Sequence, residues 1–514
     1  MMKNKNRYRA VIKGKIRFSL SHFFIFSFFI LLAACSDYES FSDNPNFRLS
    51  FSADTIAFDT LISTIPSSTK TLYAFNKNND GIRISTIRLE GGASSHFRVN
   101  VDGRYLAGGA WNDFEVLGGD SLVVRIEMTP PEVGSNEPLY FTDKLHFFLE
   151  NGAQQTVVLS GGALDAYIKK GGLIIESDET LLTDKPYVIY DSLVVKDRAT
   201  LTLTEGTTLM FHDKAALHVY GKLQVQGSIE KPVVLRGDRM DHMFDNLPYD
   251  NTPSRWEGII IHRGSYGNTL YQCDLHSSCF GIICEDTEQQ VLDETRLSVT
   301  LDGCILHHIG GDGLQLNNCA CSVTNTEISN TLGHTVKING GSHTFVYCTI
   351  AQFYYFATDL SKIGSALHLV SSTDQTEYGK IRKAHFINCV ITGYGSNIFS
   401  GENIPEDCNY LFHHCFINTP PEDSEHYVAC IFDQVKKSGE EEKLVRQDNF
   451  TVVDTKDYLY DFTPKAESKI RSLADPAYEG LPVFDRKGVN RLADEGPDAG
   501  CYEYVAPAEE GATQ

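Results

Sequence analysis

The strongest candidates for chemistry in this sequence are an aspartate and a histidine that stand in two similar glycine-containing turns. Asp312 lies in Gly311-Asp312-Gly313, and His334 follows Gly333, 22 residues after the aspartate. If the fold repeats every 22 residues, the two side chains stack on adjacent turns and could form a catalytic pair. Inverting hydrolysis of a glycosidic bond also needs a second carboxylate, and neither of these two turns contains one. Asp-Gly is also a common turn pair, so a structural role for Asp312 is the alternative.

A second candidate is the acidic segment 285–296. Clustered carboxylates bind Ca²⁺, and a neighbouring basic residue could act as the base of a polysaccharide lyase. The charged residues of the segment are Glu285, Asp286, Glu288, Asp293, Glu294 and Arg296. A solvated loop in an acidic protein explains the same composition. No cofactor is therefore expected, with Ca²⁺ at this segment as the alternative.

Two histidines, His276 and His307, each stand three residues after a cysteine. Their equivalent positions could align them on the outside of the fold. Because two histidines alone rarely form a metal site, we expect an outward polar ladder here and no metal site.

Aromatic residues gather in irregular segments of the chain, where they could bind sugar rings beside polar side chains. The candidates are Phe244, Tyr354, Tyr355 and Tyr378. The alternative is that these rings pack their own loops onto the body of the fold, because loops of a solenoid need a small core of their own.

The elements that must position these residues show in a repeat that follows Gly171-Gly172. A small residue, any residue and an aliphatic residue recur at intervals of 31, 22, 22, 41 and 26. The six copies begin at Cys273, Cys304, Thr326, Cys348, Cys389 and Cys415. The first and fourth intervals contain the polar or irregular inserts 285–297 and 359–383.

A repeat of this length with short strands and no helical period predicts one coil of a parallel β-helix per repeat. The six residues then form an inward ladder, where cysteine acts as a small apolar side chain. Buried thiols are the preferred interpretation. Disulfides between stacked cysteines and a metal cluster are the alternatives. The predicted fold class is all-β, with a right-handed parallel β-helix preceded by a small antiparallel β-sandwich.

The sandwich is predicted from residues 47–164, where apolar and polar residues alternate in short runs separated by turn residues. Period-2 runs at this spacing predict about seven antiparallel strands. The segment resembles the immunoglobulin-like domains that precede catalytic or binding domains in bacterial surface proteins.

Two further stretches carry a resemblance to a family. The run from Trp256 to Ile259 and the ending from Asp485 to Glu503 resemble the pectate-lyase-like right-handed parallel β-helix proteins of bacterial cell surfaces. The resemblance covers residues 165–505 and implies the fold rather than an activity. On physical grounds we expect the ending to cap the last coil, because an open solenoid end exposes unpaired strand edges.

The first 34 residues have the form of a secretory signal peptide. Seven basic residues precede an apolar run that ends in Leu32-Ala33-Ala34-Cys35. This tetrad resembles a bacterial lipobox, which implies that Cys35 carries the lipid anchor. We expect an outer-membrane lipoprotein at the cell surface, with the periplasmic face as the alternative. The predicted parts are the signal peptide 1–34, a tether 35–46, the sandwich 47–164, the β-helix 165–505 and a disordered tail 506–514.

The formal net charge of −22 argues against a nucleic-acid partner. We expect a surface lipoprotein whose β-helix binds glycan or another surface component without catalysis, held to the membrane by its lipid anchor. The alternative is a polysaccharide lyase or glycoside hydrolase that acts on an acidic polysaccharide.

Overall fold

The computed structural model describes residues 40–506 except 245, 288–291, 358, 374–377, 396, 406–407 and 434–447. Cys35, Glu288 and residues 507–514 lie outside this part. The chain divides into two compact units. One unit comprises the chain before Phe58 with 68–128 and 142–160, and the other comprises 58–67, 129–141 and everything from Gly161 onwards. Within the described part, no helix is both long and apolar enough to cross a membrane.

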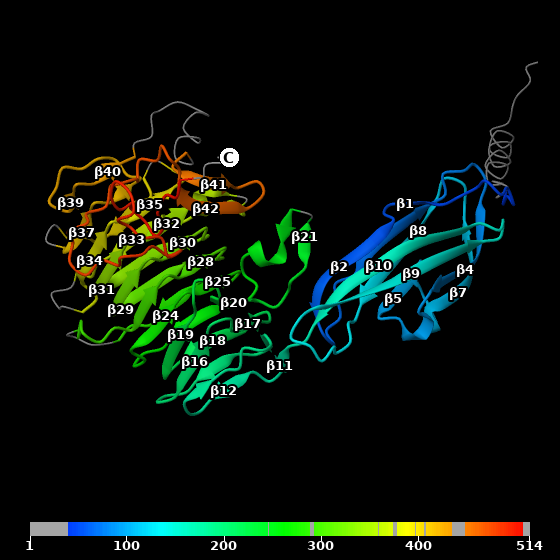
Figure 1. Ribbon diagram of the computed structural model, residues 1–514, viewed down its shortest axis with the longest axis horizontal. Coiled ribbons are helices and arrows are strands. Elements are labelled where there is room, and N and C mark those ends of the chain that lie inside the picture. The colour runs from blue at the N-terminus through cyan, green and yellow to red at the C-terminus, as the bar shows by residue number, and fades with distance from the viewer. Residues whose placement is uncertain are drawn as a thin grey trace, which may run out of the picture. The chain divides into compact units, whose positions relative to one another are not determined.

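Two antiparallel five-stranded sheets are built by the described residues up to Leu164 (Figure 1). The first sheet has the strand order β1 (Ser50–Phe51), β3 (Lys70–Phe75), β8 (Ser121–Met128), β5 (Phe97–Val101) and β6 (Arg104–Tyr105). The second has the order β2 (Thr55–Ile62), β10 (Gln154–Leu164), β9 (Leu139–Leu149), β4 (Ile82–Leu89) and β7 (Ala110–Val116).

The two sheets form a sandwich because alternate side chains on their strands are apolar and face inward. Leu72 and Ala74 on β3 are fully buried, while their neighbours on the strand are exposed. The ring of Phe51 in one sheet lies 4.9 Å from the ring of Phe147 in the other. Ten strands build these sheets in the described part, against the seven or so predicted. The two-residue strands β1 and β6 are too short to show a period in the sequence.

Two parallel sheets, of 11 and 17 strands in the described residues, build the larger unit. The 11-stranded sheet has the order β11 (Tyr167–Lys169), β14 (Tyr187–Ile189), β17 (Thr208–Phe211), β20 (Val233–Gly237), β25 (Cys273–His276), β28 (Ile305–His307), β30 (Glu327–Ser329), β32 (Thr349–Gln352), β35 (Val390–Gly393), β38 (Phe416–Ile417) and β40 (Ile431–Phe432).

The 17-stranded sheet has the order β12 (Leu173–Ile175), β13 (Glu179–Thr180), β15 (Leu193–Val195), β16 (Thr200–Thr204), β18 (Ala216–Val219), β19 (Lys222–Gln226), β23 (Gly258–Ile261), β24 (Asn268–Tyr271), β26 (Ile282–Cys284), β27 (Val299–Asp302), β29 (Leu314–Thr324), β31 (Val336–Val346), β33 (Leu367–Val370), β34 (Ile381–Ile387), β36 (Phe399–Glu402), β37 (Tyr410–His413) and β39 (Tyr427–Val428).

Shorter elements lie outside these sheets. They are the hairpins β21 (His242–Phe244) with β22 (Leu247–Pro248) and β41 (Phe450–Asp454) with β42 (Leu459–Pro464), and the 3₁₀ turns η1 (Gly92–Ser94), η2 (Ala107–Gly109), η3 (Tyr249–Asn251) and η4 (Leu360–Lys362).

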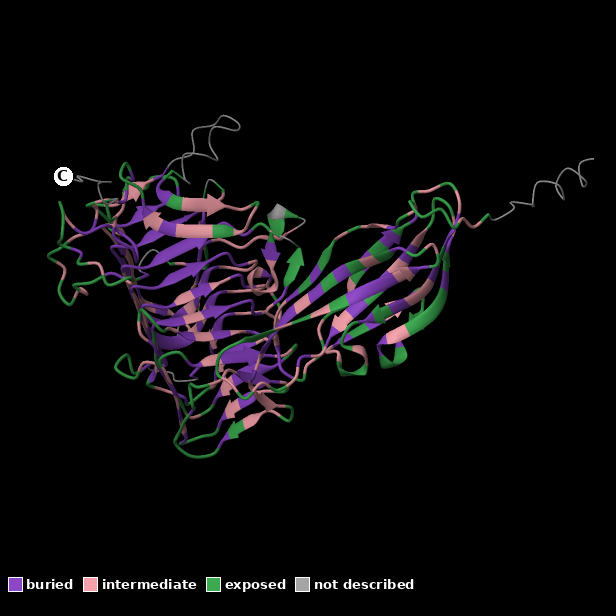
Figure 2. Ribbon diagram, turned by 45° about the vertical axis from the view of Figure 1, so that its right-hand side comes forward, coloured by how far each residue is buried: buried purple, intermediate pink, exposed green. Residues whose placement is uncertain are grey.

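The strands stack coil upon coil around one apolar core, as the buried residues in Figure 2 show. Pairs such as Asp274 with Ile305 and Glu327 with Thr349 keep neighbouring coils in register. This register places the predicted ladder in one column, and all six of its residues are buried. All twelve described cysteines carry free thiols. The predicted fold class, a parallel β-helix preceded in the chain by an antiparallel sandwich, is confirmed.

The ladder continues beyond the six predicted positions. Cys430 follows Cys415 in the column, because Phe416 pairs with Ile431. The sequence template missed this position because Phe432 replaces the aliphatic residue of the pattern.

The C-terminal ending does not lie across the last coil, so the predicted capping role is wrong for its described part. Instead, residues 484–503 run along the side of the β-helix, over interior coils. The backbone oxygens of Arg486 and Phe484 accept hydrogen bonds from Gln272 and Asn325, and Gly500 N donates to Asn388 O. The turns in this column carry amide side chains, and these side chains form hydrogen bonds with the backbone of the ending.

Candidate functional site

An open groove of about 610 Å³ lies on the outer face of the 17-stranded sheet, over β29, β31 and β33. Outward side chains at equivalent positions of adjacent coils are neighbours, because Asn317 pairs with Asn339 and Asn339 pairs with Val370. The remaining lining residues are Asn318 within β29 and residues of the loops that follow β26, β33 and β36. They are Asp286, Asn318, Ser371, Ser372, Thr373, Tyr378, Gly379 and Asn403. Four of the lining residues are thus asparagines.

The asparagines on the strands form a short ladder. Asn339 Nδ2 donates to Asn317 Oδ1 over 2.7 Å, and Asn317 Nδ2 donates to the backbone oxygen of Cys284 over 2.9 Å. Gln315 Nε2 also donates to Asn317 Oδ1, over 3.1 Å. The ladder fixes the amide of Asn317. Among the described residues, Asn339 Oδ1 and the amide of Asn403 have no partner, so both can bind a ligand.

The wall of the groove is held by Asp286, which joins two of its loops. The hydroxyl of Tyr378 donates to Asp286 Oδ2, and Asn318 Nδ2 donates to Asp286 Oδ1 over 3.2 Å. Asn318 has a positive φ of 38°, and its Oδ1 accepts from Gly379 N. These contacts orient the half-buried ring of Tyr378 at the groove.

Asp312 and His334 occupy equivalent positions directly before β29 and β31, as their spacing predicted. Asp312 Oδ1 accepts a hydrogen bond of 2.7 Å from the backbone nitrogen of His334, and Lys337 Nζ lies 3.6 Å from Asp312 Oδ2. Both oxygens of Asp312 therefore have partners. The catalytic role of this pair stays a prediction.

The ring of His334 lies against a second histidine. It stacks on His368 with 4.2 Å between ring centroids, and its Nδ1 accepts from Ser365 N over 3.1 Å. Burial, with the charge of the neighbouring His368, lowers the pKa of His334, and burial also lowers the pKa of His368. Both rings are therefore neutral near pH 7, and the proton of His334 resides on Nε2.

The four predicted glycan-binding aromatics do not come together. Of these, Tyr378 alone lines the groove. Tyr354 is only 4% exposed, whereas Tyr355 and Phe244 are exposed. Next to Tyr354, Phe353 packs in a cluster with Phe462 of β42. Part of this aromatic segment therefore serves packing.

The described carboxylates of the acidic segment form hydrogen bonds or ion pairs with separate partners. Glu285 Oε2 lies 3.1 Å from His262 Nδ1, Glu294 Oε2 accepts from Ser342 Oγ, and Asp293 accepts from Thr295. Arg296 lies over the ring of Tyr266. The Ca²⁺ alternative at this segment stays a prediction.

The asparagines of the groove are not among the residues predicted from the sequence. Asn317 and Asn339 are 22 residues apart, so the spacing that singled out Asp312 and His334 could have found them. Asn403 and Tyr378 come from irregular inserts, where counting by repeats fails.

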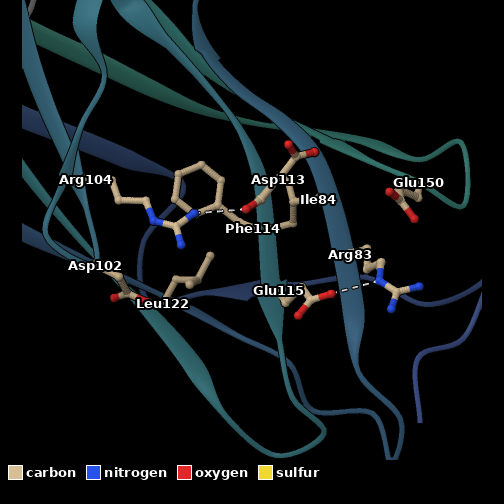
Figure 3. A pocket seen from close by; sticks show the side chains of 9 residues that line it. All are labelled: Arg83, Ile84, Asp102, Arg104, Asp113, Phe114, Glu115, Leu122 and Glu150. Atoms are coloured by element: carbon tan, nitrogen blue, oxygen red, sulfur yellow. Dashed lines mark hydrogen bonds and ion pairs between the residues drawn. The ribbon is translucent and has the colours of Figure 1, made fainter. Parts of the chain in front are cut away.

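A second pocket, of about 470 Å³, lies in the sandwich (Figure 3). Ile84, Phe114 and Leu122 form its apolar part. Three of its charged side chains are engaged: Arg83 Nε lies 3.0 Å from Glu115 Oε1, and Arg104 Nη1 donates to the backbone oxygen of Asp113. The hydrogen bond to Glu115 raises the pKa of Arg83. We assign this pocket to cross-strand stabilisation.

Comparison with known proteins gives little. No family model and no curated protein matches the chain. Among solved structures, a family 123 glycoside hydrolase from Clostridium perfringens is similar over 23% of this chain and 26% of its own, with 7% identity and a TM-score of 0.17.

Two further structures are similar to a comparable extent. PapD-like domain 7 of human CEP192 is similar over 24% of this chain and 90% of its own, at 14% identity and a TM-score of 0.17. The VesB protease of Vibrio cholerae is similar over 23% and 31%, at 10% identity and a TM-score of 0.16. At these scores, none of the likenesses carries an argument about fold or function.

Proposed function

We propose that the protein binds a neutral, hydroxyl-rich glycan in the groove over β29, β31 and β33. The observation that carries the proposal is the lining of four asparagines beside the ring of Tyr378. An amide both donates and accepts hydrogen bonds, as a sugar hydroxyl does. The volume also lies in the range of ligand sites, about 300–1,000 Å³.

The charges of the groove favour a neutral ligand. Among the lining residues that the structure describes, Asp286 is the one that carries a charge, and it already accepts from Tyr378 and Asn318. A nucleic acid or an acidic polysaccharide would require several lysines or arginines. The geometry therefore favours hydrogen bonding to hydroxyls over pairing with anions.

Catalysis is supported less well than binding. A hydrolase needs one carboxyl group to donate a proton and another to activate water or attack. Asp312 is held by the backbone of His334 and by Lys337, which leaves neither of its oxygens without a partner. A hydrolase or lyase remains the second candidate, and release of reducing ends or unsaturated uronate from a glycan would favour it.

The test is to measure binding of neutral oligosaccharides to the full chain and to variants of Tyr378. Tyr378→Ala should weaken binding about tenfold or more, because it removes a sugar-stacking ring. Tyr355→Ala is the matched control, since this exposed tyrosine lies outside the groove. Equal affinity of the two variants, or no binding of neutral glycans to the parent chain, would refute the proposal.

We further propose that the chain is a surface lipoprotein of the pectate-lyase-like β-helix superfamily, that Cys35 carries its lipid, and that the sandwich is an immunoglobulin-like spacer. The lipobox-like tetrad and the β-helix with its preceding sandwich support this assignment. Cys35→Ala should move the protein from the membrane fraction to the soluble fraction of cells. A variant that still fractionates with membranes would remove the anchor.

A further inference from the structure

A second cluster of polar side chains lies on the outer face of the 11-stranded sheet. Its residues belong to the neighbouring strands β25 and β28, which Figure 1 labels. Asp274 and His276 are two residues apart on β25, so both face the same way. His307 on β28 is the register partner of His276. Because adjacent strands lie about 4.8 Å apart, the three side chains meet. Their ligand atoms lie within 4.8 Å of one another.

One carboxylate oxygen lies at the centre of this cluster. Asp274 Oδ1 lies 2.8 Å from His276 Nδ1 and 3.2 Å from His307 Nε2. Both nitrogens must donate to this oxygen, since a carboxylate only accepts. Two imidazole nitrogens and one carboxylate oxygen therefore converge on one point of the sheet.

Each histidine is held from behind by a further residue. Asp250 on η3 accepts from His276 Nε2 over 2.8 Å, and Asp250 itself pairs with Arg236 at 2.9 Å. His308 Nδ1 bonds His307 Nδ1. Metal-binding histidines are typically held in this way, with the second ring nitrogen bonded to a carboxylate or another polar group.

His308 supplies an independent observation. It is 4% exposed, and its Nε2 is buried with no hydrogen-bond partner among the described atoms. The tautomers explain this absence. The proton of His307 is on Nε2, which donates to Asp274, so His307 Nδ1 must accept from His308 Nδ1. The proton of His308 is therefore on Nδ1, and His308 Nε2 carries no proton. The rings of Phe356 and Tyr460 stand steeply to the His308 ring, with centroid distances of 6.5 and 5.8 Å.

We propose that Asp274, His276 and His307 bind one divalent transition-metal ion of the zinc class, with Asp250 and His308 orienting the two histidines. Imidazole and carboxylate ligands suit such ions, and two histidines with one carboxylate form a recognised ligand set. Ca²⁺ is disfavoured because it takes six to eight oxygen ligands. Three protein ligands leave a coordination position open, on the side where Asp274 and His307 are partly exposed.

The protons balance in a simple way. The metal takes the place of the protons on His276 Nδ1 and His307 Nε2. The His307 proton is kept, because it moves to Nδ1 and donates to His308, whose own proton moves to the orphaned Nε2. The proton of His276 Nδ1 leaves, so binding should release about one proton per metal ion.

The test is a calorimetric Zn²⁺ titration of the full chain, purified without a histidine tag, in two buffers of different ionisation enthalpy. We expect one tight site and release of about one proton. His307→Gln should abolish this site. Asp250→Asn should weaken it by about 10- to 100-fold, as loss of an orienting partner does. Absence of tight Zn²⁺ binding would overturn the proposal.

The matched control is His413→Gln. His413, His414 and Asp475 form the other mixed cluster of the described residues, but His414 Nδ1 already bonds the backbone oxygen of Leu473. This variant should bind Zn²⁺ like the parent chain. If it loses the site while His307→Gln keeps it, the assignment is wrong.

Co²⁺ provides a readout that does not depend on a variant folding. In the parent chain it should give visible ligand-field bands without the thiolate charge-transfer band of cysteine ligation. A thiolate band at one equivalent would place the metal on the cysteines and overturn the proposal.

Discussion

At the scale of single residues, the cysteine ladder shows why a thiol suits the inward position. Cys304, Cys348 and Cys389 each donate to a carbonyl oxygen of the preceding coil, namely that of Leu270, Val323 and Phe345. Thr326 keeps the same column and donates to Thr324 O over 2.7 Å. The position therefore favours a small side chain with a donor from Cys273 onwards, where cysteines and Thr326 stand, whereas Val233 fills the same position in the coil before Cys273.

Cys304→Val should lower the free energy of unfolding by about 1 kcal/mol, because it keeps the size of the side chain but removes the hydrogen-bond donor. Cys304→Thr should cost less than this. Urea denaturation of both variants measures the difference. Equal losses would mean that packing alone selects the residue.

The buried His343 should make the free energy of unfolding decrease as the pH falls below 6.5. Burial lowers the pKa of His343 from 6.5 to about 4. Below pH 6.5, His343 takes up a proton in the unfolded chain, whereas in the folded chain it stays neutral until about pH 4. Stability should therefore fall by up to about 3 kcal/mol between these values.

In His343→Gln, this acid-side loss should be smaller, because glutamine does not titrate. Urea midpoints at neutral pH and near pH 4.5 measure the change. His242→Gln, on the exposed strand β21, is the control and should keep the full pH dependence. Identical profiles for His343→Gln and the parent chain would contradict the assignment.

At the scale of elements, the turns before the ladder residues hold the C-terminal ending in place. Gln272, Asn325, Tyr347 and Asn388 have φ between 47° and 56°. Asparagine tolerates this left-handed conformation better than most residues. The same asparagines then bind the ending and the segment before it: Asn325 accepts from Arg491 in the ending, and Asn388 pairs with the backbone of Asp475, which precedes it.

Arg491 is the main anchor of the ending. It is 1% exposed, pairs with Glu503, and lies 3.6 Å from the centroid of the Tyr347 ring. Arg491→Ala should cost about 3–5 kcal/mol, because it removes the guanidinium that pairs with the buried Glu503 and leaves that carboxyl group only the backbone nitrogen of Asp498 as a donor. It should also make the ending sensitive to protease.

Arg471→Ala is the control for this prediction. Arg471 pairs with Asp494 at 3.1 Å, but both side chains are partly exposed. Exposed pairs contribute about 0–1 kcal/mol, so the urea midpoint should move much less. A similar shift for both variants would mean that the burial of Arg491 adds nothing.

The sequence predicted those elements whose positions follow from the spacing of its repeat. The 22-residue spacing located the ladder and placed Asp312 beside His334 correctly. It could not place Tyr378 or Asn403, because these come from inserts whose path depends on tertiary contacts. It also could not show that Asp250 meets His276, since η3 lies outside the counted repeat. Two histidines looked too few for a metal site because Asp274, which shares their face of the sheet, was not counted with them.

At the scale of the whole molecule, one apolar cluster extends from Ile175 to Ile417 through the β-helix. In a solenoid each coil contacts only its neighbours, so stability is roughly a sum of local interfaces. Coils at an end have one neighbour instead of two and should open first. All twelve described cysteines lie in this unit, between Cys273 and Cys501, so their reactivity reports on its opening alone.

Pulsed alkylation with peptide mass spectrometry should therefore reveal a gradient along the axis. Among the ladder cysteines, Cys430, which is partly exposed in the last described coil, should react first, followed by Cys415 and then Cys389. Cys304, with coils on both sides and the ending bound at the neighbouring turns, should react last. Arg491→Ala should speed the reaction of Cys348 more than that of Cys415, because the anchor lies over Tyr347. A single rate for all buried thiols would instead show that the β-helix opens as one cooperative unit.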